Sequence, residues 1–225
     1  MKPFVDRVDA GRQLASALLN MKGKNAIVLA IPRGGVVVGF EVADALGVPL
    51  DVIIPRKIGA PNNPELAIGA VTEDGTTILN EELIKDLQVE EDYIRKESER
   101  QQLEIERRMK SYRRETPYSD VGNRDVIIVD DGIATGATMK AALASVRRRG
   151  AKSVTVAVPV GPSSTIQELK KEADRVVCLS TPEFFQAIGQ FYDDFGQTFD
   201  EEVVRLLKLN ARKQATSSKT EGASA

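Results

Sequence analysis

The sequence contains no histidine and only one cysteine, Cys178. The absence of histidine excludes imidazole general bases, Ser-His triads and histidine-ligated zinc. A single cysteine excludes an internal disulfide and a multi-cysteine metal site, and its place in the apolar run Arg-Val-Val-Cys-Leu is typical of a buried strand. Any chemistry must therefore come from carboxylates, lysine, arginine, hydroxyls and a bound ion such as Mg²⁺. These groups suit reactions driven by positioning and charge stabilisation.

Long apolar runs are also absent. No stretch reaches the ~18 apolar residues that a membrane span needs, and the first seven residues carry charges without a signal-peptide core. We therefore expect a cytoplasmic protein with no membrane partner. The net charge of −2 argues against non-specific binding of nucleic acid. A length of 225 residues with 42% hydrophobic content predicts one full core.

Residues 126–139 form the most informative segment. Four apolar β-branched residues predict a buried strand, which ends at two adjacent carboxylates, Asp130 and Asp131. These carboxylates repel a phosphate but suit the hydroxyls of a ribose, or a Mg²⁺ held through water.

A loop with Gly132 and Gly136 follows, and a helix is expected over residues 139–149. The glycines let backbone N–H groups approach an anion, the helix N-terminus adds unpaired donors, and Thr135 and Thr138 add hydroxyls. Strand, acidic pair, loop and helix together predict a site for a phosphorylated sugar. The alternative is an ordinary strand-turn-helix corner whose aspartates only cap the turn.

Two other strand ends carry groups suited to anions. After the strand expected at residues 26–31, Arg33 supplies a positive charge, and Gly34 and Gly35 supply backbone donors at the start of a helix. This combination suits a pyrophosphate, although Pro-Arg-Gly-Gly is also a plain turn. After a third apolar strand, at residues 50–54, Arg56 and Lys57 indicate an anionic ligand or a solvated basic pair.

The segment 126–139 closely resembles the phosphoribosyl-pyrophosphate (PRPP) motif of type I phosphoribosyltransferases, in which apolar residues precede two acidic residues and a Thr-Gly-x-Thr loop. The resemblance implies an α/β fold with a central, mainly parallel sheet flanked by helices, a small hood and a charged helical insertion. It also implies a loop after the first core strand that grips pyrophosphate, often through a strained or cis peptide. The run at Arg56 and Lys57 looks like the Arg-Lys-x-Gly segment of the adenine enzymes. PRPP would contact, by this resemblance, Arg33, Gly34, Gly35, Arg56, Lys57, Asp130, Asp131, Gly132, Ala134, Thr135, Gly136, Ala137 and Thr138.

One position departs from the hypoxanthine-guanine enzymes. They carry an aspartate just before the Thr-Gly pair, where this sequence has Ala134, as the adenine and uracil enzymes do. A 6-oxopurine substrate is therefore in doubt. Glu65, in the stretch 60–70 that matches the family's flexible loop and hairpin, is the nearest carboxylate. It is a candidate for orienting a base or accepting a proton, or it caps a strand.

Residues 181–200 hold six of the eleven phenylalanine and tyrosine residues. Aromatic faces near a PRPP site can stack a nucleobase. The segment is faintly similar to the hood of the hypoxanthine-guanine enzymes, which makes Phe185, Tyr192 and Asp193 candidates for a base pocket. The alternative is a small hood core that packs on the sheet.

The expected domain covers residues 1–209, with a helical insertion at 81–115, a hood at 181–205 and a disordered tail at 210–225. The insertion has a thin apolar stripe, which predicts one helix lying lightly on the domain or a dimer contact. Further helices are expected at 10–21, 36–46 and 164–171, strands at 153–158 and 175–179, and a β-hairpin at 66–79.

The resemblance implies Mg²⁺-dependent transfer of a phosphoribosyl group from PRPP to an unidentified base, with Arg33, Glu65, Asp130 and Asp131 as catalytic candidates and Asp130 and Asp131 as the metal site. A homodimer is common in this family. Three alternatives remain: a non-catalytic PRPP- or nucleotide-binding regulator, another phosphosugar enzyme, and a structural domain built on residues 81–115.

Overall fold

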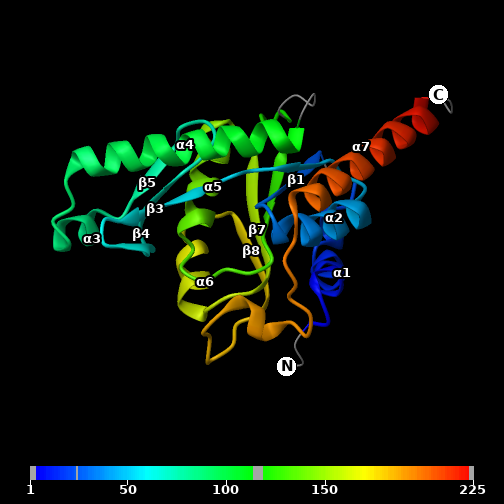
Figure 1. Cartoon of the computed structure of the whole chain (residues 1–225). Coiled ribbons are helices and arrows are strands. Elements are labelled where there is room, and N and C mark those ends of the chain that lie inside the picture. The colour runs from blue at the N-terminus through cyan, green and yellow to red at the C-terminus, as the bar shows by residue number, and fades with distance from the viewer. Residues whose placement is uncertain (1–3, 24, 114–118, 223–225) are drawn as a thin grey trace.

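The computed structural model describes residues 4–23, 25–113 and 119–222; the side chains of Glu65 and of residues 217–222 also lie outside the description. A parallel sheet of five strands forms the centre, in the order β2-β1-β6-β7-β8 (Figure 1). Its strands are β1 (Ala26–Ala30), β2 (Leu50–Val52), β6 (Asp125–Val129), β7 (Ser153–Val160) and β8 (Arg175–Ser180). The predicted fold class is confirmed.

Helices cover both faces of this sheet. Along β1, Val28 and Ala30 belong to the core on one face, whereas Ile27 and Leu29 belong to the core on the other, because successive side chains of a strand point in opposite directions. The first face packs against α1 (Arg7–Ala17), the 3-10 turn η1 (Leu19–Met21) and α2 (Gly34–Leu46). The second face packs against α5 (Ala137–Arg148) and α6 (Ser163–Leu169).

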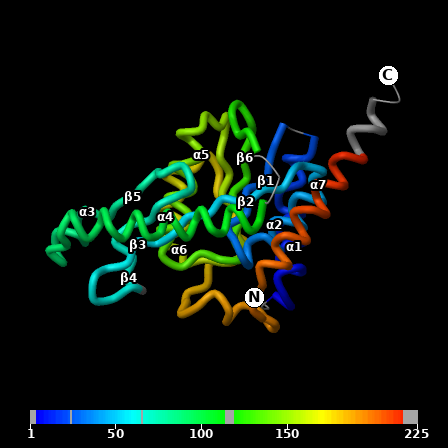
Figure 2. Tube along the Cα trace, turned by 45° about the horizontal axis from the view of Figure 1, so that its top comes forward, coloured from blue at the N-terminus to red at the C-terminus, as the bar shows by residue number. Residues whose placement is uncertain are grey.

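A second, antiparallel sheet projects from the body with α3 (Glu81–Asp86), and we call these elements the arm (Figure 2). Its strands are β3 (Arg56–Ala60), β4 (Asn63–Val71) and β5 (Thr77–Leu79). The pairing of β4 with β5 confirms the hairpin predicted at 66–79. At its turn the Asp74 carboxylate accepts hydrogen bonds from the hydroxyls of Thr72 and Thr76, and Arg148 of α5 donates to the Thr76 hydroxyl at 2.9 Å. The turn is thereby fastened to α5.

The arm corrects one prediction about the third strand end. Arg56 and Lys57 do not follow directly on β2 of the parallel sheet; they begin β3, which pairs with β4. The chain therefore leaves the central sheet at residues 53–55 and enters the arm with these two cations.

The charged insertion forms two helices, α3 and α4 (Glu91–Arg113), where one helix was expected. The apolar stripe of α4 is not a light surface contact, because Ile105, Met109 and Tyr112 are buried in the core shared with α2. Arg113 at the end of α4 forms a buried ion pair of 2.9 Å with Asp51 of β2. Residues 114–118, which include the last two of the predicted insertion, lie outside the described residues.

The chain ends in a long helix, α7 (Asp200–Gly222) (Figure 1). The expected disordered tail beginning at residue 210 is therefore wrong for residues 210–216, because α7 continues through them. Asn210 is 2% exposed; its carboxamide accepts a hydrogen bond from the Leu50 N–H at 2.8 Å and donates to the Val48 carbonyl at 3.2 Å. Among the helices that are described, none is long and apolar enough to cross a membrane.

We expect Asn210→Ala to lower the free energy of unfolding by about 1–3 kcal/mol, because it removes the partner of two buried backbone groups next to β2. The measurement is urea unfolding. Lys213→Ala is the matched control on the same helix: its ion pair with Asp44 is exposed, so its loss should cost less than about 1 kcal/mol. Equal small effects would contradict the docking of α7 on β2.

Candidate active site

Two of the predicted strand ends lie side by side. Strands β1 and β6 are neighbours, with Ala30 paired to Val129, so the loops that follow them begin together at the carboxyl edge of the sheet. A Cβ atom on Gly34 would lie 1.9 Å from Oδ2 of Asp131, and one on Gly35 would lie 2.9 Å from Oδ1 of Asp130. These two glycines are thus required by the contact between the loops, beyond the anion access for which they were predicted.

Arg33 stands at the start of α2, as its N-cap residue. The peptide bond between Pro32 and Arg33 is cis, a feature that the resemblance implied for this loop. Nη1 of Arg33 lies 3.8 Å from Oδ1 of Asp200, the first residue of α7. The positive charge predicted for a pyrophosphate therefore faces a carboxylate of the chain itself.

The acidic pair has unequal surroundings. Oδ1 of Asp130 accepts a hydrogen bond from the Asp131 N–H at 2.8 Å. Burial, followed by the charge of Asp131, raises the pKa of Asp130 well above its ordinary value. Oδ2 of Asp131 instead accepts from Nε of Arg7 at 2.7 Å. One carboxylate is thus paired with an arginine, while burial disfavours the charged form of the other.

Arg7 is a site residue that the sequence did not reveal. Its guanidinium also donates to the Gly196 carbonyl at 2.7 Å and lies 3.8 Å from the centre of the Phe195 ring. The side chain is 13% exposed. Arg7 therefore connects the acidic pair to the hood. This role becomes visible only in the folded chain, where residues far apart in sequence meet. No sequence motif in the first turn of α1 points to it.

The loop after the acidic pair is held in place by contacts with residues of other elements. The Ile133 N–H donates to the Val160 carbonyl at 2.9 Å, and the Thr165 hydroxyl donates to the Ala134 carbonyl at 2.8 Å. A Cβ atom on Gly132 would lie 2.5 Å from Ile188 of the hood. Ala134 and the adjacent Thr135 stay exposed. The loop is consequently shaped by β7, α6 and the hood together.

Helix α5 begins at Ala137, two residues earlier than predicted. Its N-cap residue is Gly136, with φ of +78°, and no side chain caps this terminus. Backbone N–H groups in a first helical turn have no partner within the helix, and Thr138 lies in that turn. The combination of uncapped N–H groups and the helix dipole favours an anion at this position.

The cations of the third predicted strand end, Arg56 and Lys57, belong to the arm and lie near the first turn of α5. A cavity of about 360 Å³ is lined by Lys57 and Thr138, together with Tyr93 and Arg100 of α4. Nε of Arg56 donates to Oε1 of Gln101 at 2.8 Å. Burial lowers the pKa of Arg56, and Arg108 lowers it further. The structure thus brings Lys57 to the first turn of α5 and adds α4, which the sequence did not predict as part of the site.

The hood contains the 3-10 helix η2 (Ile188–Phe191). One of the three residues predicted to contact a base in the hood is buried. Tyr192 is 6% exposed, its ring centre lies 5.4 Å from that of Phe4, and its hydroxyl donates to the Asp131 carbonyl at 2.5 Å. Tyr192 therefore cannot offer a ring face to a base, and the alternative of a hood core is correct for this residue. Phe185 is half-buried and stacks on Phe191 at 5.4 Å, and Asp193 is exposed.

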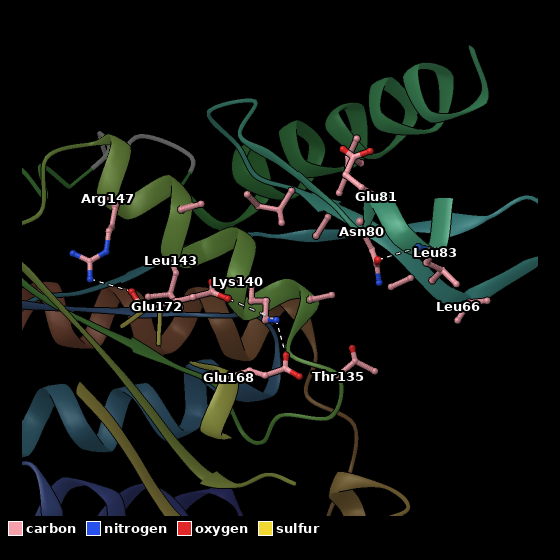
Figure 3. Close-up of a pocket in the computed structure, with 17 residues that line it drawn as sticks. Leu66, Asn80, Glu81, Leu83, Thr135, Lys140, Leu143, Arg147, Glu168 and Glu172 are labelled. Atoms are coloured by element: carbon pink, nitrogen blue, oxygen red, sulfur yellow. Dashed lines mark hydrogen bonds and ion pairs between the residues drawn. The ribbon is translucent and has the colours of Figure 1, made fainter. Parts of the chain in front are cut away.

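A larger cleft of about 960 Å³ separates the arm from α5 and α6 (Figure 3). Thr135 lies at its wall, and Lys140 lies between Glu168 at 2.7 Å and Glu172 at 3.7 Å. Neither aspartate of the acidic pair lines this cleft. It is a feature distinct from the acidic pair and shares Thr135 and Ala137 with the predicted site.

The family model described as the phosphoribosyl transferase domain matches residues 5–195. The chain belongs to this family. A protein of Mycobacterium tuberculosis that carries the provisional name phosphoribosyl transferase is 47% identical over 207 residues, which cover 92% of this chain and 47% of the relative. The chain thus spans about half the length of the curated relatives it matches. The crystal structure of TT1426 from Thermus thermophilus is 45% identical, with a TM-score of 0.79, and the match covers 92% of this chain and 98% of that one.

Within this phosphoribosyl transferase domain, the structure brings together most of the predicted PRPP contacts. Gly34 and Gly35, which follow Arg33, meet Asp131 and Asp130 at neighbouring strand ends, and Lys57 of the arm lines the same cavity as Thr138. Glu65 belongs to β4, but its side chain lies outside the described residues, so its role stays a prediction.

We expect Asp130→Asn to stabilise the protein at neutral pH. Because the pKa of Asp130 is raised in the folded state, ionising this group costs stability, and the cost grows as the pH rises above the ordinary carboxyl range of about 4. Asparagine keeps an oxygen for the Asp131 N–H. The variant should therefore be more stable to urea than the wild type at pH 7, and this difference in stability should shrink toward pH 4.

Urea unfolding between pH 4 and pH 8 measures this difference. Asp86→Asn is the matched control, because it removes the same charge from an exposed position of α3. A less stable Asp130→Asn variant at pH 7 would contradict the unfavourable ionisation of Asp130.

Proposed function

We propose that this protein transfers the 5-phosphoribosyl group of PRPP to a base, with release of pyrophosphate and with Mg²⁺ as cofactor. The observation that carries the proposal is the contact between the Arg33–Gly35 loop and the acidic pair, beside the uncapped N-terminus of α5. Groups for a diphosphate, for ribose hydroxyls and for a second phosphate thus occur within one edge of the sheet.

Each part of PRPP has a chemically matching partner. The 5-phosphate suits the backbone N–H groups and hydroxyls of residues 134–138, at the positive end of α5. The ribose hydroxyls suit the carboxylate oxygens of Asp130 and Asp131, which accept hydrogen bonds. The diphosphate suits Arg33 and Lys57, since phosphate oxygens pair with both kinds of cation. Direct contact between a phosphate and the acidic pair is opposed by like charges, so the diphosphate would approach these carboxylates through a bound cation.

The acidic pair also fits a magnesium ion. Among the described residues no cluster of three metal-binding side chains occurs, so an all-protein cage is not formed. Mg²⁺ needs no such cage, because it keeps several waters and commonly binds through one or two carboxylates plus substrate phosphates. Asp130 and Asp131 would hold the ion together with PRPP, and a bound ion would supply positive charge at the departing diphosphate.

The reaction breaks the bond between C1 of the ribose and the diphosphate oxygen, and positive charge develops on the ribose ring while negative charge develops on the diphosphate. Arg33 and Lys57 favour the second change, and carboxylates on the ribose side favour the first. This electrostatic strategy needs no imidazole. Because the loop has Ala134 and no carboxylate beside the base, the acceptor is expected to be other than a 6-oxopurine, with Glu65 as the candidate proton acceptor.

A second candidate function is a regulatory protein that binds PRPP or a nucleotide without catalysis. Ala134 favours this alternative, because a proton-abstracting group is missing from the loop. The two functions differ in one product: only a transferase releases pyrophosphate. The test is pyrophosphate release from PRPP and Mg²⁺ in the presence of adenine, hypoxanthine, guanine, xanthine, uracil, orotate or nicotinate. Binding of PRPP without release for any acceptor would favour the regulator.

We expect Asp131→Asn to weaken PRPP binding at least about tenfold, because a charge-assisted hydrogen bond to a ribose hydroxyl is lost. Isothermal titration with PRPP and Mg²⁺ measures the change, and Asp86→Asn is again the exposed control. Since Asp131 also pairs with Arg7, thermal unfolding must show that the variant is folded at the titration temperature. Unchanged affinity in a folded variant would remove Asp131 from the binding site.

A further inference from the structure

Arg33 already has an anionic partner within the chain. Its Nη1 atom lies 3.8 Å from Oδ1 of Asp200, and the two side chains are 35% and 32% exposed. At this distance the contact is a loose ion pair that leaves the guanidinium free to turn toward a better acceptor. Arg33 can therefore exchange Asp200 for a phosphate without leaving its place at the start of α2.

Asp200 is held more firmly than Arg33. The same Oδ1 atom accepts a hydrogen bond from the Tyr112 hydroxyl at 2.7 Å. Tyr112 is 4% exposed, and burial together with this hydrogen bond raises the pKa of its hydroxyl. The hydroxyl consequently remains a donor at all physiological pH values. Asp200 is thereby anchored to the buried end of α4 and cannot follow Arg33 away.

The three residues come from three separate elements. Arg33 precedes α2, Tyr112 lies near the end of α4, and Asp200 begins α7. The family match ends at residue 195, so Asp200 and α7 lie beyond the region that defines the family. Arg33 and Tyr112 lie inside the matched region, whereas Asp200 lies outside it.

A diphosphate at Arg33 would place its negative charge close to an anchored carboxylate. Asp200 attracts Arg33 in the absence of ligand and repels the diphosphate when it arrives, and both effects oppose binding. We propose that Asp200 is an internal counter-ion of Arg33 that lowers the affinity of the site for the diphosphate, so that α7 sets how tightly PRPP binds and how readily pyrophosphate leaves. This inference rests on the proposed function, because it needs the diphosphate to bind at Arg33.

The test is Asp200→Asn, which removes the charge and keeps an oxygen for the Tyr112 hydroxyl. Isothermal titration with Mg²⁺ gives the Kd of three ligands: PRPP, inorganic pyrophosphate and ribose 5-phosphate. We expect the Kd values of PRPP and pyrophosphate to fall about three- to fivefold, the size expected for a partly exposed charge pair. The Kd of ribose 5-phosphate, which has no diphosphate, should stay the same. Higher salt should reduce the gain, because it screens exposed charges.

The matched control is Glu201→Gln, which removes the same charge from the next, exposed position of α7. It should leave all three Kd values within about 1.5-fold of the wild type, since its charge is screened by water. Thermal unfolding shows whether each variant is folded. A Kd for pyrophosphate that is unchanged or higher in Asp200→Asn would overturn the inference while leaving the proposed function intact. If the folded wild type binds neither PRPP nor pyrophosphate, the proposed function fails as well.

Discussion

The contact between the loops after β1 and β6 is the constraint on which the candidate site depends. Hydrogen-bonded pairing of these two strands brings Gly34 against Asp131 and Gly35 against Asp130, so closely that no Cβ atom fits. The contact places a cation-bearing loop beside two carboxylates. Arg7 and Tyr192 then hold Asp131 from the N-terminal helix and from the hood. Removing the contact would separate the two halves of the site.

Charges in this site are balanced in advance by partners within the chain. Asp131 faces Arg7, and Arg33 faces Asp200. The N-terminus of α5, by contrast, has no capping side chain. Within the part of the chain that the structure describes, the two regions suited to an anion therefore differ: the α5 terminus has no side-chain cap, whereas Arg33 has a carboxylate partner. In the proposed binding mode, the 5-phosphate and the diphosphate of PRPP would therefore meet different surroundings, although both regions carry positive charge.

Local sequence predicted the features that depend on neighbouring residues. The apolar run, the acidic pair, the glycines and the helix of residues 126–148 follow each other along the chain, so their strand, loop and helix could be placed from the pattern alone. The hairpin at 66–79 was predicted for the same reason. Features that join distant segments were missed. Arg7 reaches Asp131 over more than a hundred residues, and Asn210 docks on β2 from a segment whose polar composition suggested disorder.

The sequence by itself determined the fold class, the family and the identity of the loops that carry the candidate site, because these depend on short patterns of apolar, acidic and glycine residues. Tertiary structure alone decided which side chains pair with the charged residues of those loops. In the folded chain Tyr192 is buried next to Asp131, Arg56 and Lys57 belong to the arm, and Asp200 forms an ion pair with Arg33. The physical reason is that charge pairing and burial depend on distances in space, and separation along the chain does not define those distances.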